Sequence, residues 1–107
     1  MFKRLLRFVA FRFGRLWSLY DRLYHASAIE RANYLRLHGG FYSIGKNVSI
    51  NKGASFTDPA YVRIGNNVVL SDCTLIGHDG VVAMLFHAYG VRVDSVGKID
   101  ICDNVFI

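Results

Sequence analysis

The chain has 107 residues, a length typical of one domain. It is 52 % hydrophobic and contains a single proline, a composition that excludes an intrinsically disordered chain. The formal net charge is +5, but most of the excess positive charge lies in residues 1–38, and residues 39–107 are nearly neutral. A nucleic acid is therefore not an expected partner, since residues 39–107 offer no basic surface.

Residues 1–24 form a basic and amphipathic segment. Apolar side chains recur there with a period near 3.6, and arginines lie on the opposite side of the predicted helix. The arginines leave no apolar run near the ~20 residues that span a bilayer. Such a helix can lie in a membrane interface, or it can pack on the rest of the protein or on a second subunit. The sequence leaves these alternatives open.

A second, shorter helix is predicted over residues 28–37. Gly39 and Gly40 follow it, and glycines commonly end a helix. We therefore divide the chain into a helical leader, residues 1–40, and a second region, residues 41–107.

The second region contains a repeat. The segments YSIGKNVSI (42–50), VRIGNNVVL (62–70) and IDICDNVFI (99–107) share one pattern, with Asn47, Asn67 and Asn104 in the same position. Asn is enriched where the backbone takes a positive φ, so the recurring Asn predicts a recurring tight corner. The valine that follows each Asn is expected to point inward.

Between these copies an apolar residue recurs every six positions, apart from a two-residue insertion before Ile64. A unit of six residues suits a short strand plus a corner, and three such units would close one turn of a coil. The alternative is an antiparallel sheet of hairpins, which would show a period of two. The residues expected to point into the core are Ile44, Ile50, Phe56, Ile64, Leu70 and Ile76.

The six-residue repeat stops at His78, in the stretch CTLIGHDG (73–80), and resumes near residue 99. An irregular loop of this length, about residues 78–98, is unusual in a compact repeat and is commonly functional. The loop carries apolar residues that could cover a ligand. Neutral imidazole is a suitable general base near pH 7, so His78 is the leading candidate for a site residue.

These motifs together resemble the hexapeptide-repeat acyltransferases over about residues 42–107, and within them the galactoside, capsule and exopolysaccharide O-acetyltransferases. The resemblance rests on the repeat itself, on CTLIGHDG, and on the returning KIDICDNVFI (98–107). It implies a mainly β fold, a left-handed parallel β-helix of about three coils preceded by the helical leader. It also implies a homotrimer.

The resemblance implies transfer of an acetyl group from acetyl-CoA to a sugar hydroxyl, in the biosynthesis of cell-surface polysaccharide. His78 would be the general base, and Asp79 would either orient the imidazole or face solvent. Phe86, His87 and Tyr89 would belong to a substrate loop. A backbone N–H near Gly77 or Gly80 would stabilise the oxyanion. No residue is assigned to CoA binding, and no metal is expected.

The expected location is the cytoplasm, at the inner face of the membrane if residues 1–24 contact lipid. The sequence ends at Ile107, one residue before the glycine that follows VFI in the family. We therefore expect a truncated family member. The alternative to an active transferase is a non-catalytic remnant or a membrane-associated assembly module of the same fold.

Overall fold

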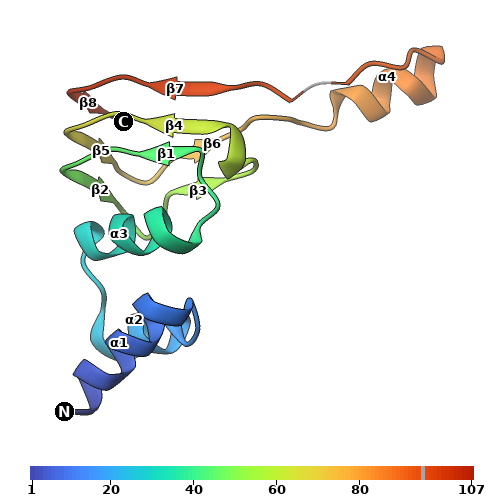
Figure 1. The fold of residues 1–107 in the computed structure, drawn as a ribbon. Coiled ribbons are helices and arrows are strands. Elements are labelled where there is room, and N and C mark those ends of the chain that lie inside the picture. Colours follow the sequence, from blue (N-terminus) through green and yellow to red (C-terminus); the bar gives the residue numbers. More distant parts are fainter. Residues whose placement is uncertain (95) are drawn as a thin grey trace.

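A computed structural model describes residues 1–94 and 96–107. Helices dominate the N-terminal part and short strands the C-terminal part, with one further helix projecting to the side (Figure 1). The described residues form the α-helices α1 (Phe2–Phe13), α2 (Trp17–Tyr24), α3 (Ala28–His38) and α4 (Val81–Tyr89), and the 3-10 helix η1 (Pro59–Tyr61). The strands are β1 (Ser43–Ile44), β2 (Val48–Ile50), β3 (Ser55–Phe56), β4 (Val62–Ile64), β5 (Val68–Leu70), β6 (Thr74–Leu75), β7 (Ile99–Ile101) and β8 (Val105–Phe106).

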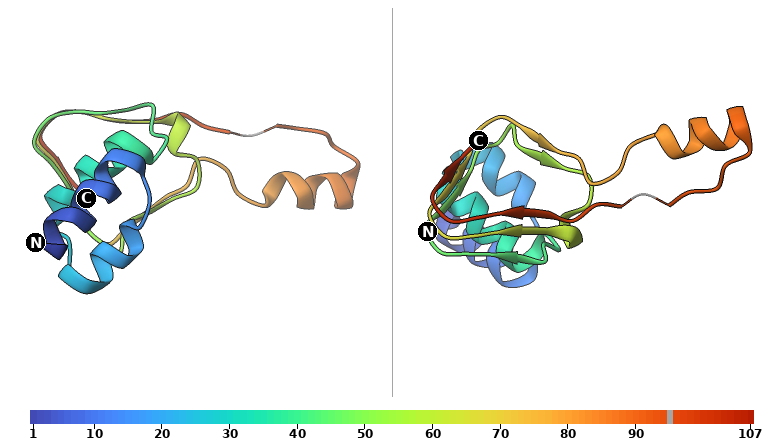
Figure 2. Two further views of the ribbon diagram at one scale, coloured as in Figure 1. Left: turned by 60° about the horizontal axis from the view of Figure 1, so that its bottom comes forward. Right: turned by 90° about the horizontal axis from the view of Figure 1, so that it is seen from above.

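The strands pair in small parallel sheets. One sheet has the order β1-β4-β7, a second the order β2-β5-β8, and a third consists of β3 and β6. The chain visits the sheets in turn and then returns to the first (Figure 2). β4, β5 and β6 therefore lie beside strands made about twenty residues earlier, and β7 and β8 lie beside strands made 37 residues earlier. The pairing keeps the repeat in register, with Ile44 opposite Ile64 and Val48 opposite Val68.

The predicted fold class is wrong. About 41 % of the chain is helical and only 19 % is strand, and no left-handed β-helix is evident. The class is mixed α/β, with short strands in parallel sheets. Two features explain the difference. The corners come so often that each strand keeps only two or three residues, and the segment expected to be an irregular loop contains α4.

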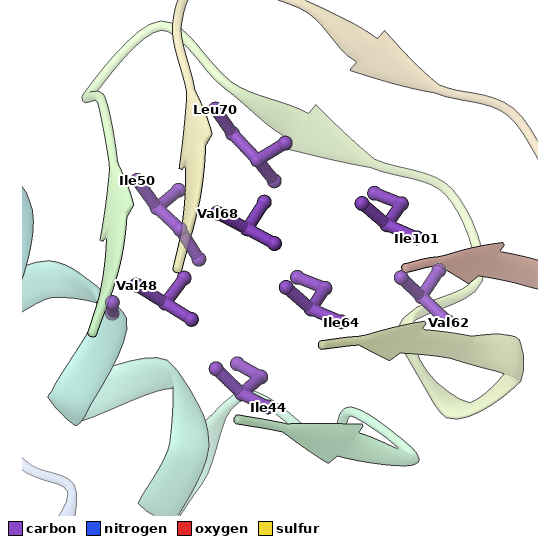
Figure 3. Packing of buried hydrophobic residues seen from close by; sticks show 9 residues of the cluster. Ile44, Val48, Ile50, Val62, Ile64, Val68, Leu70 and Ile101 are labelled. Carbon is purple, nitrogen blue, oxygen red and sulfur yellow. The ribbon is translucent and has the colours of Figure 1, made fainter. Parts of the chain in front are cut away.

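The core lies between the sheets and is aliphatic. Ile50, Ile64 and Leu70 are fully buried, and Ile44 is nearly so, which confirms four of the expected inward positions (Figure 3). Phe56 is only partly buried. The prediction that Ile76 points into the core is wrong, because its side chain is 58 % exposed. It follows β6, where the chain already turns away from the sheets toward α4.

The Asn corners are confirmed. Asn47, Asn67 and Asn104 have φ values of 55°, 55° and 61°. Their amides also hydrogen-bond to one another along the stack, since Asn47 Nδ2 donates to Asn67 Oδ1 and Asn67 Nδ2 donates to Asn104 Oδ1, each at 2.8 Å. The Asn therefore supplies both the left-handed backbone conformation and a side-chain ladder.

Helix α3 covers the outer edge of β1 and β2. Ala32, on its inner face, is fully buried in the core cluster. Arg36 Nε donates to the carbonyl of Ile44 at 3.1 Å, and Arg31 Nη1 donates to the carbonyl of Ile50 at 3.3 Å. An uncovered strand edge would leave such carbonyls open to pairing with another chain. The two arginines therefore help to close this end of the sheets.

The leader is two helices rather than one amphipathic helix through residue 24. Gly14 and Leu16 both take a positive φ, and the chain reverses between α1 and α2. The two helices pack on each other through Leu6, Ala10 and Tyr20. One of their contacts with α3 is made by Trp17, whose ring stacks on Tyr34 at 4.1 Å between centroids.

Glu30, in the first turn of α3, joins the leader helices to α3. Its carboxylate accepts hydrogen bonds from Tyr20 Oη at 2.7 Å and from Arg7 Nε at 2.9 Å. Burial of the carboxylate acts to raise its pKa, but the hydrogen bonds from Tyr20, Arg7 and the Ser27 backbone outweigh it and hold the pKa below 4.5. The ionised form is therefore favoured in the folded chain.

We expect acid to loosen the contact between the leader helices and α3. Because the folded pKa of Glu30 is lowered, its contribution to stability is present above 4.5, the usual pKa, and is lost as the pH falls through the lower folded value. The near-ultraviolet circular dichroism of the Trp17–Tyr34 stack, titrated downward from neutral pH, measures this. In Glu30→Gln the acid-dependent loss should be smaller than in the wild type. An identical titration would contradict the assignment.

Candidate functional site

The candidate site lies at the corner from which α4 projects (Figure 1). Residues 57 and 58 follow β3, and residues 77 and 78 follow β6, the strand paired with β3. The chain returns to the same corner after α4, where Gly97 N donates to Gly77 O at 2.7 Å. Three segments that are distant in the sequence are thus neighbours at this corner.

A short network of hydrogen bonds connects these segments. His78 Nδ1 lies 2.6 Å from Asp58 Oδ2. The same carboxylate oxygen accepts from Thr57 Oγ1 at 2.7 Å, and that hydroxyl in turn accepts from Gly77 N at 2.9 Å. The imidazole is 51 % exposed, whereas the Asp58 carboxylate is only 18 % exposed. The exposed imidazole of His78 is therefore held in place by a carboxylate that is itself much less exposed.

The network also determines which ring nitrogen is available. The hydrogen bonds from His78 and, to a lesser degree, from Thr57 hold the pKa of Asp58 below its usual value of 3.8. An ionised carboxylate can only accept hydrogen bonds, so Nδ1 of neutral His78 carries the proton. Nε2 then has its lone pair available, and it is the nitrogen that can remove a proton from a bound hydroxyl.

Gly77 permits the close approach of the two layers. A Cβ built on Gly77 would lie 2.8 Å from Asp58 Oδ2, closer than such atoms pack. The φ of Gly77 is not positive, so the glycine is needed for space and not for a special backbone conformation. Any larger residue here would displace the carboxylate that contacts His78.

Of the two roles expected for Asp79, orienting the imidazole or facing solvent, the structure shows the second, because the residue is exposed. Asp79 Oδ1 accepts a hydrogen bond from Val81 N at 3.0 Å, at the start of α4. The carboxylate that contacts His78 is that of Asp58. Asp79 therefore helps to begin a helix, and Asp58 takes the orienting position.

Phe86, His87 and Tyr89 do not lie in an irregular loop. They belong to α4, which points away from the sheets and ends at Gly90, whose φ is 65° (Figure 2). All three side chains are exposed, and Tyr89 is among the most exposed residues of the chain. The structure does not bring them to His78 of the same chain.

Of the two expected oxyanion donors, Gly77 N–H already donates to the Thr57 hydroxyl. Next to the corner, on the outer face of β1, β4 and β7, lies a shallow hollow of about 300 Å³. Two tyrosines, two cations and Asp100 contribute to its walls, and Arg63 donates two hydrogen bonds to Asp100 there. The lining residues are Tyr42, Ala60, Tyr61, Arg63, Lys98 and Asp100.

The sequence interpretation missed Asp58 and Thr57. A signal for Asp58 was present, because Asp58 precedes His78 by twenty residues, the same separation that relates Ile44 to Ile64 and Asn47 to Asn67. Residues with that separation lie one above the other in β1 and β4 and in β2 and β5, and the separation is nineteen in β3 and β6. Applying this spacing to His78 would have indicated the acid beside it.

Among residues 1–94 and 96–107, no group of three His, Cys, Asp or Glu side chains is placed to hold a metal ion. In the same part of the chain, each helix is too short or too polar to cross a bilayer. Comparison of the chain with protein-family models, curated proteins and solved structures found no match. The family suggested by the sequence motifs therefore stays a prediction.

Proposed function

We propose that the chain is an O-acetyltransferase that moves an acetyl group from acetyl-CoA to a sugar hydroxyl. The observation that carries the proposal is the 2.6 Å contact between the exposed imidazole of His78 and the shielded carboxylate of Asp58. A histidine oriented by a carboxylate is a general base that works at neutral pH. The resemblance to the hexapeptide-repeat acyltransferases supplies the donor and the class of acceptor.

In the proposed reaction, His78 Nε2 removes the proton of the acceptor hydroxyl as its oxygen attacks the thioester carbonyl carbon. The carbonyl π bond opens to an oxyanion, and the tetrahedral intermediate collapses with cleavage of the carbon–sulfur bond. The CoA thiolate leaves and takes the proton from the imidazolium. Asp58 stabilises the imidazolium by its negative charge, so it acts as a positioning residue that does not touch substrate.

The proposal includes a homotrimer in the cytoplasm that participates in the synthesis of a cell-surface polysaccharide. Helix α4 supports an assembly of several copies. Because α4 projects away from its own chain, Phe86, His87 and Tyr89 would reach the His78 of a neighbouring copy. The apolar side chains of Val81 and Met84, which are exposed in the single chain, would then be covered.

Release of CoA from acetyl-CoA, followed with a thiol reagent in the presence of sugars, tests the activity. Replacement of Asp58 by Asn should lower kcat at least about tenfold, because the imidazolium loses its neighbouring negative charge.

Asp79→Asn is the matched control, since an amide oxygen can still accept from Val81 N. It should leave the rate and the pH profile unchanged. Equal effects of the two substitutions would contradict the role of Asp58. An absence of sugar-dependent CoA release by the wild-type chain would overturn the proposed activity and favour the non-catalytic assembly module.

A further inference from the structure

The outer surface of α1 and α2 is both apolar and cationic. Leu5 and Phe13 are 60 % and 58 % exposed, although the packing of α1 on α2 buries Leu6 and Ala10 beside them. A surface of this kind is unusual on a domain that stands alone in water. The large apolar residues exposed on this hairpin of helices are Phe2, Leu5, Phe8, Phe13, Leu16, Leu19 and Leu23.

The spacing of these residues orders the surface. Arg4, Phe8 and Arg12 follow one another at intervals of four residues, and so do Leu5, Val9 and Phe13. Residues four apart lie on the same side of a helix, so α1 presents an apolar row directly beside a row that carries two arginines. This arrangement suits a helix that lies flat at the boundary between headgroups and acyl chains.

The charge on this surface has one sign. Residues 1–20 contain no Asp or Glu. The two acids that follow are engaged elsewhere, because Asp21 pairs with Arg31 and Glu30 pairs with Arg7. The exposed cations of the hairpin, Lys3, Arg4, Arg12, Arg15 and Arg22, therefore produce a positive field that complements an anionic surface.

A hollow on α1 adds a place for an anionic group. Its volume is about 370 Å³, and Arg4, Arg7 and Arg12 surround the rings of Phe8 and Phe11 there. A guanidinium group can bind a phosphate through two parallel hydrogen bonds, and the aromatic rings offer contact to acyl carbons. Helix α1 thus offers contacts to both the phosphate headgroup and the acyl chains of a phospholipid.

We propose that α1 and α2 bind the surface of a membrane that contains anionic phospholipid. The hairpin lies at the end of the molecule opposite β7 and β8, so the sheets and His78 would face away from the lipid (Figure 1). Binding combines insertion of the exposed apolar row with attraction between the arginines and the headgroups. This inference does not depend on the proposed chemistry at His78.

Co-sedimentation of the full chain with vesicles tests the proposal. The chain should bind vesicles of phosphatidylcholine with phosphatidylglycerol and bind phosphatidylcholine alone much more weakly. Rising salt should release it, because the charges at the surface are screened. Failure to bind the anionic vesicles, or equal binding to both kinds, would overturn the proposal.

Two double variants separate the contributions. Replacing Arg4 and Arg12 by Gln should weaken binding roughly 25-fold, at about fivefold for each cation near an anionic surface. Replacing Leu5 and Phe13 by Gln should weaken it by about tenfold or more, since the inserted apolar area is lost. Near-ultraviolet circular dichroism of the Trp17–Tyr34 stack shows whether each variant retains the hairpin.

The matched controls lie outside the hairpin. Lys46→Gln with Arg92→Gln removes two exposed cations, and Phe106→Gln removes an exposed aromatic ring. Both should bind as the wild type does, and a loss equal to that of the hairpin variants would contradict the proposal. It would also be overturned if the Leu5 and Phe13 substitutions dissociated an oligomer in the absence of lipid, because a second copy of the chain would then cover this surface.

Discussion

Replacing His78 with alanine is expected to lower kcat for acetyl transfer by about 10²–10⁴-fold, the contribution typical of a general base. The imidazole is the candidate base at this corner, because the pKa of Asp58 is lowered and the ionised carboxylate holds the ring by a hydrogen bond. Initial rates of CoA release at saturating acetyl-CoA and acceptor measure the effect. The KM for acetyl-CoA should change far less than kcat, since the imidazole acts on the acceptor hydroxyl.

His78→Gln is the variant that separates chemistry from structure. Its side-chain amide can still donate to Asp58, so the corner keeps a hydrogen bond, but it cannot serve as a base. We expect a loss of activity similar to that of His78→Ala with no change in thermal unfolding. Wild-type rates in His78→Gln would show that the histidine only holds the corner together.

Replacing Leu70 with alanine is expected to lower the free energy of unfolding by about 2–5 kcal/mol. Leu70 is fully buried at the end of β5, lies opposite the fully buried Ile50 of β2 and belongs to the aliphatic core cluster. The shorter side chain would leave a cavity in this core, which the surrounding structure fills only in part. Urea unfolding followed by circular dichroism measures the change.

Val69→Ala is the matched control on the same strand. Val69 is the neighbour of Leu70 but points outward and is 36 % exposed. Its replacement should cost less than about 1 kcal/mol, because the loss is confined to strand propensity and an exposed contact. If both substitutions cost the same, the inward orientation of Leu70 would be contradicted. A change of 2–5 kcal/mol is a large share of the ~5–15 kcal/mol that stabilises a domain of this size.

The sequence predicted those features that depend on neighbouring residues. The corners were predicted from the recurring Asn47, Asn67 and Asn104, because few residues other than Gly and Asn tolerate a positive φ. Ile50, Ile64 and Leu70 were identified as core residues because a period of six repeats the same inward direction. The start of α3 was also readable, since Ser27 and Glu30 form a capping box, although this pattern was not used.

The wrong predictions concern backbone conformations and contacts that a periodic pattern of apolar residues does not describe. Gly14 and Leu16 divide the leader because both take left-handed backbone conformations, and a leucine gives no warning of this. The helix α4 was missed although Asp79 and Gly90 lie at its two ends, since its apolar side chains gave no clear amphipathic period. Gly45 and Gly65 allow the layers to approach closely, and a periodic pattern of apolar residues does not describe this contact.

In the candidate site, too, one residue was identified from the local sequence and another, which depends on a contact between layers, was not. His78 was found because the repeat stops there, which is a local signal. Asp58 was not found because its relation to His78 is a contact between layers, and the only acid weighed as an orienting residue was Asp79, the neighbour of His78 in the sequence. In a chain whose layers stack at a separation of twenty residues, partners of a site residue are better sought one layer away than one residue away.

The arginines that α3 directs at β1 and β2 have a consequence for biosynthesis. The ribosome makes α3 before any strand, so Arg31 and Arg36 are available when the first carbonyls emerge. Each later strand then finds an already formed neighbour about twenty residues behind it, apart from β7 and β8, which must wait for α4 to be made. Each sheet can therefore grow in the order of synthesis, because the strand made last lies at its open edge.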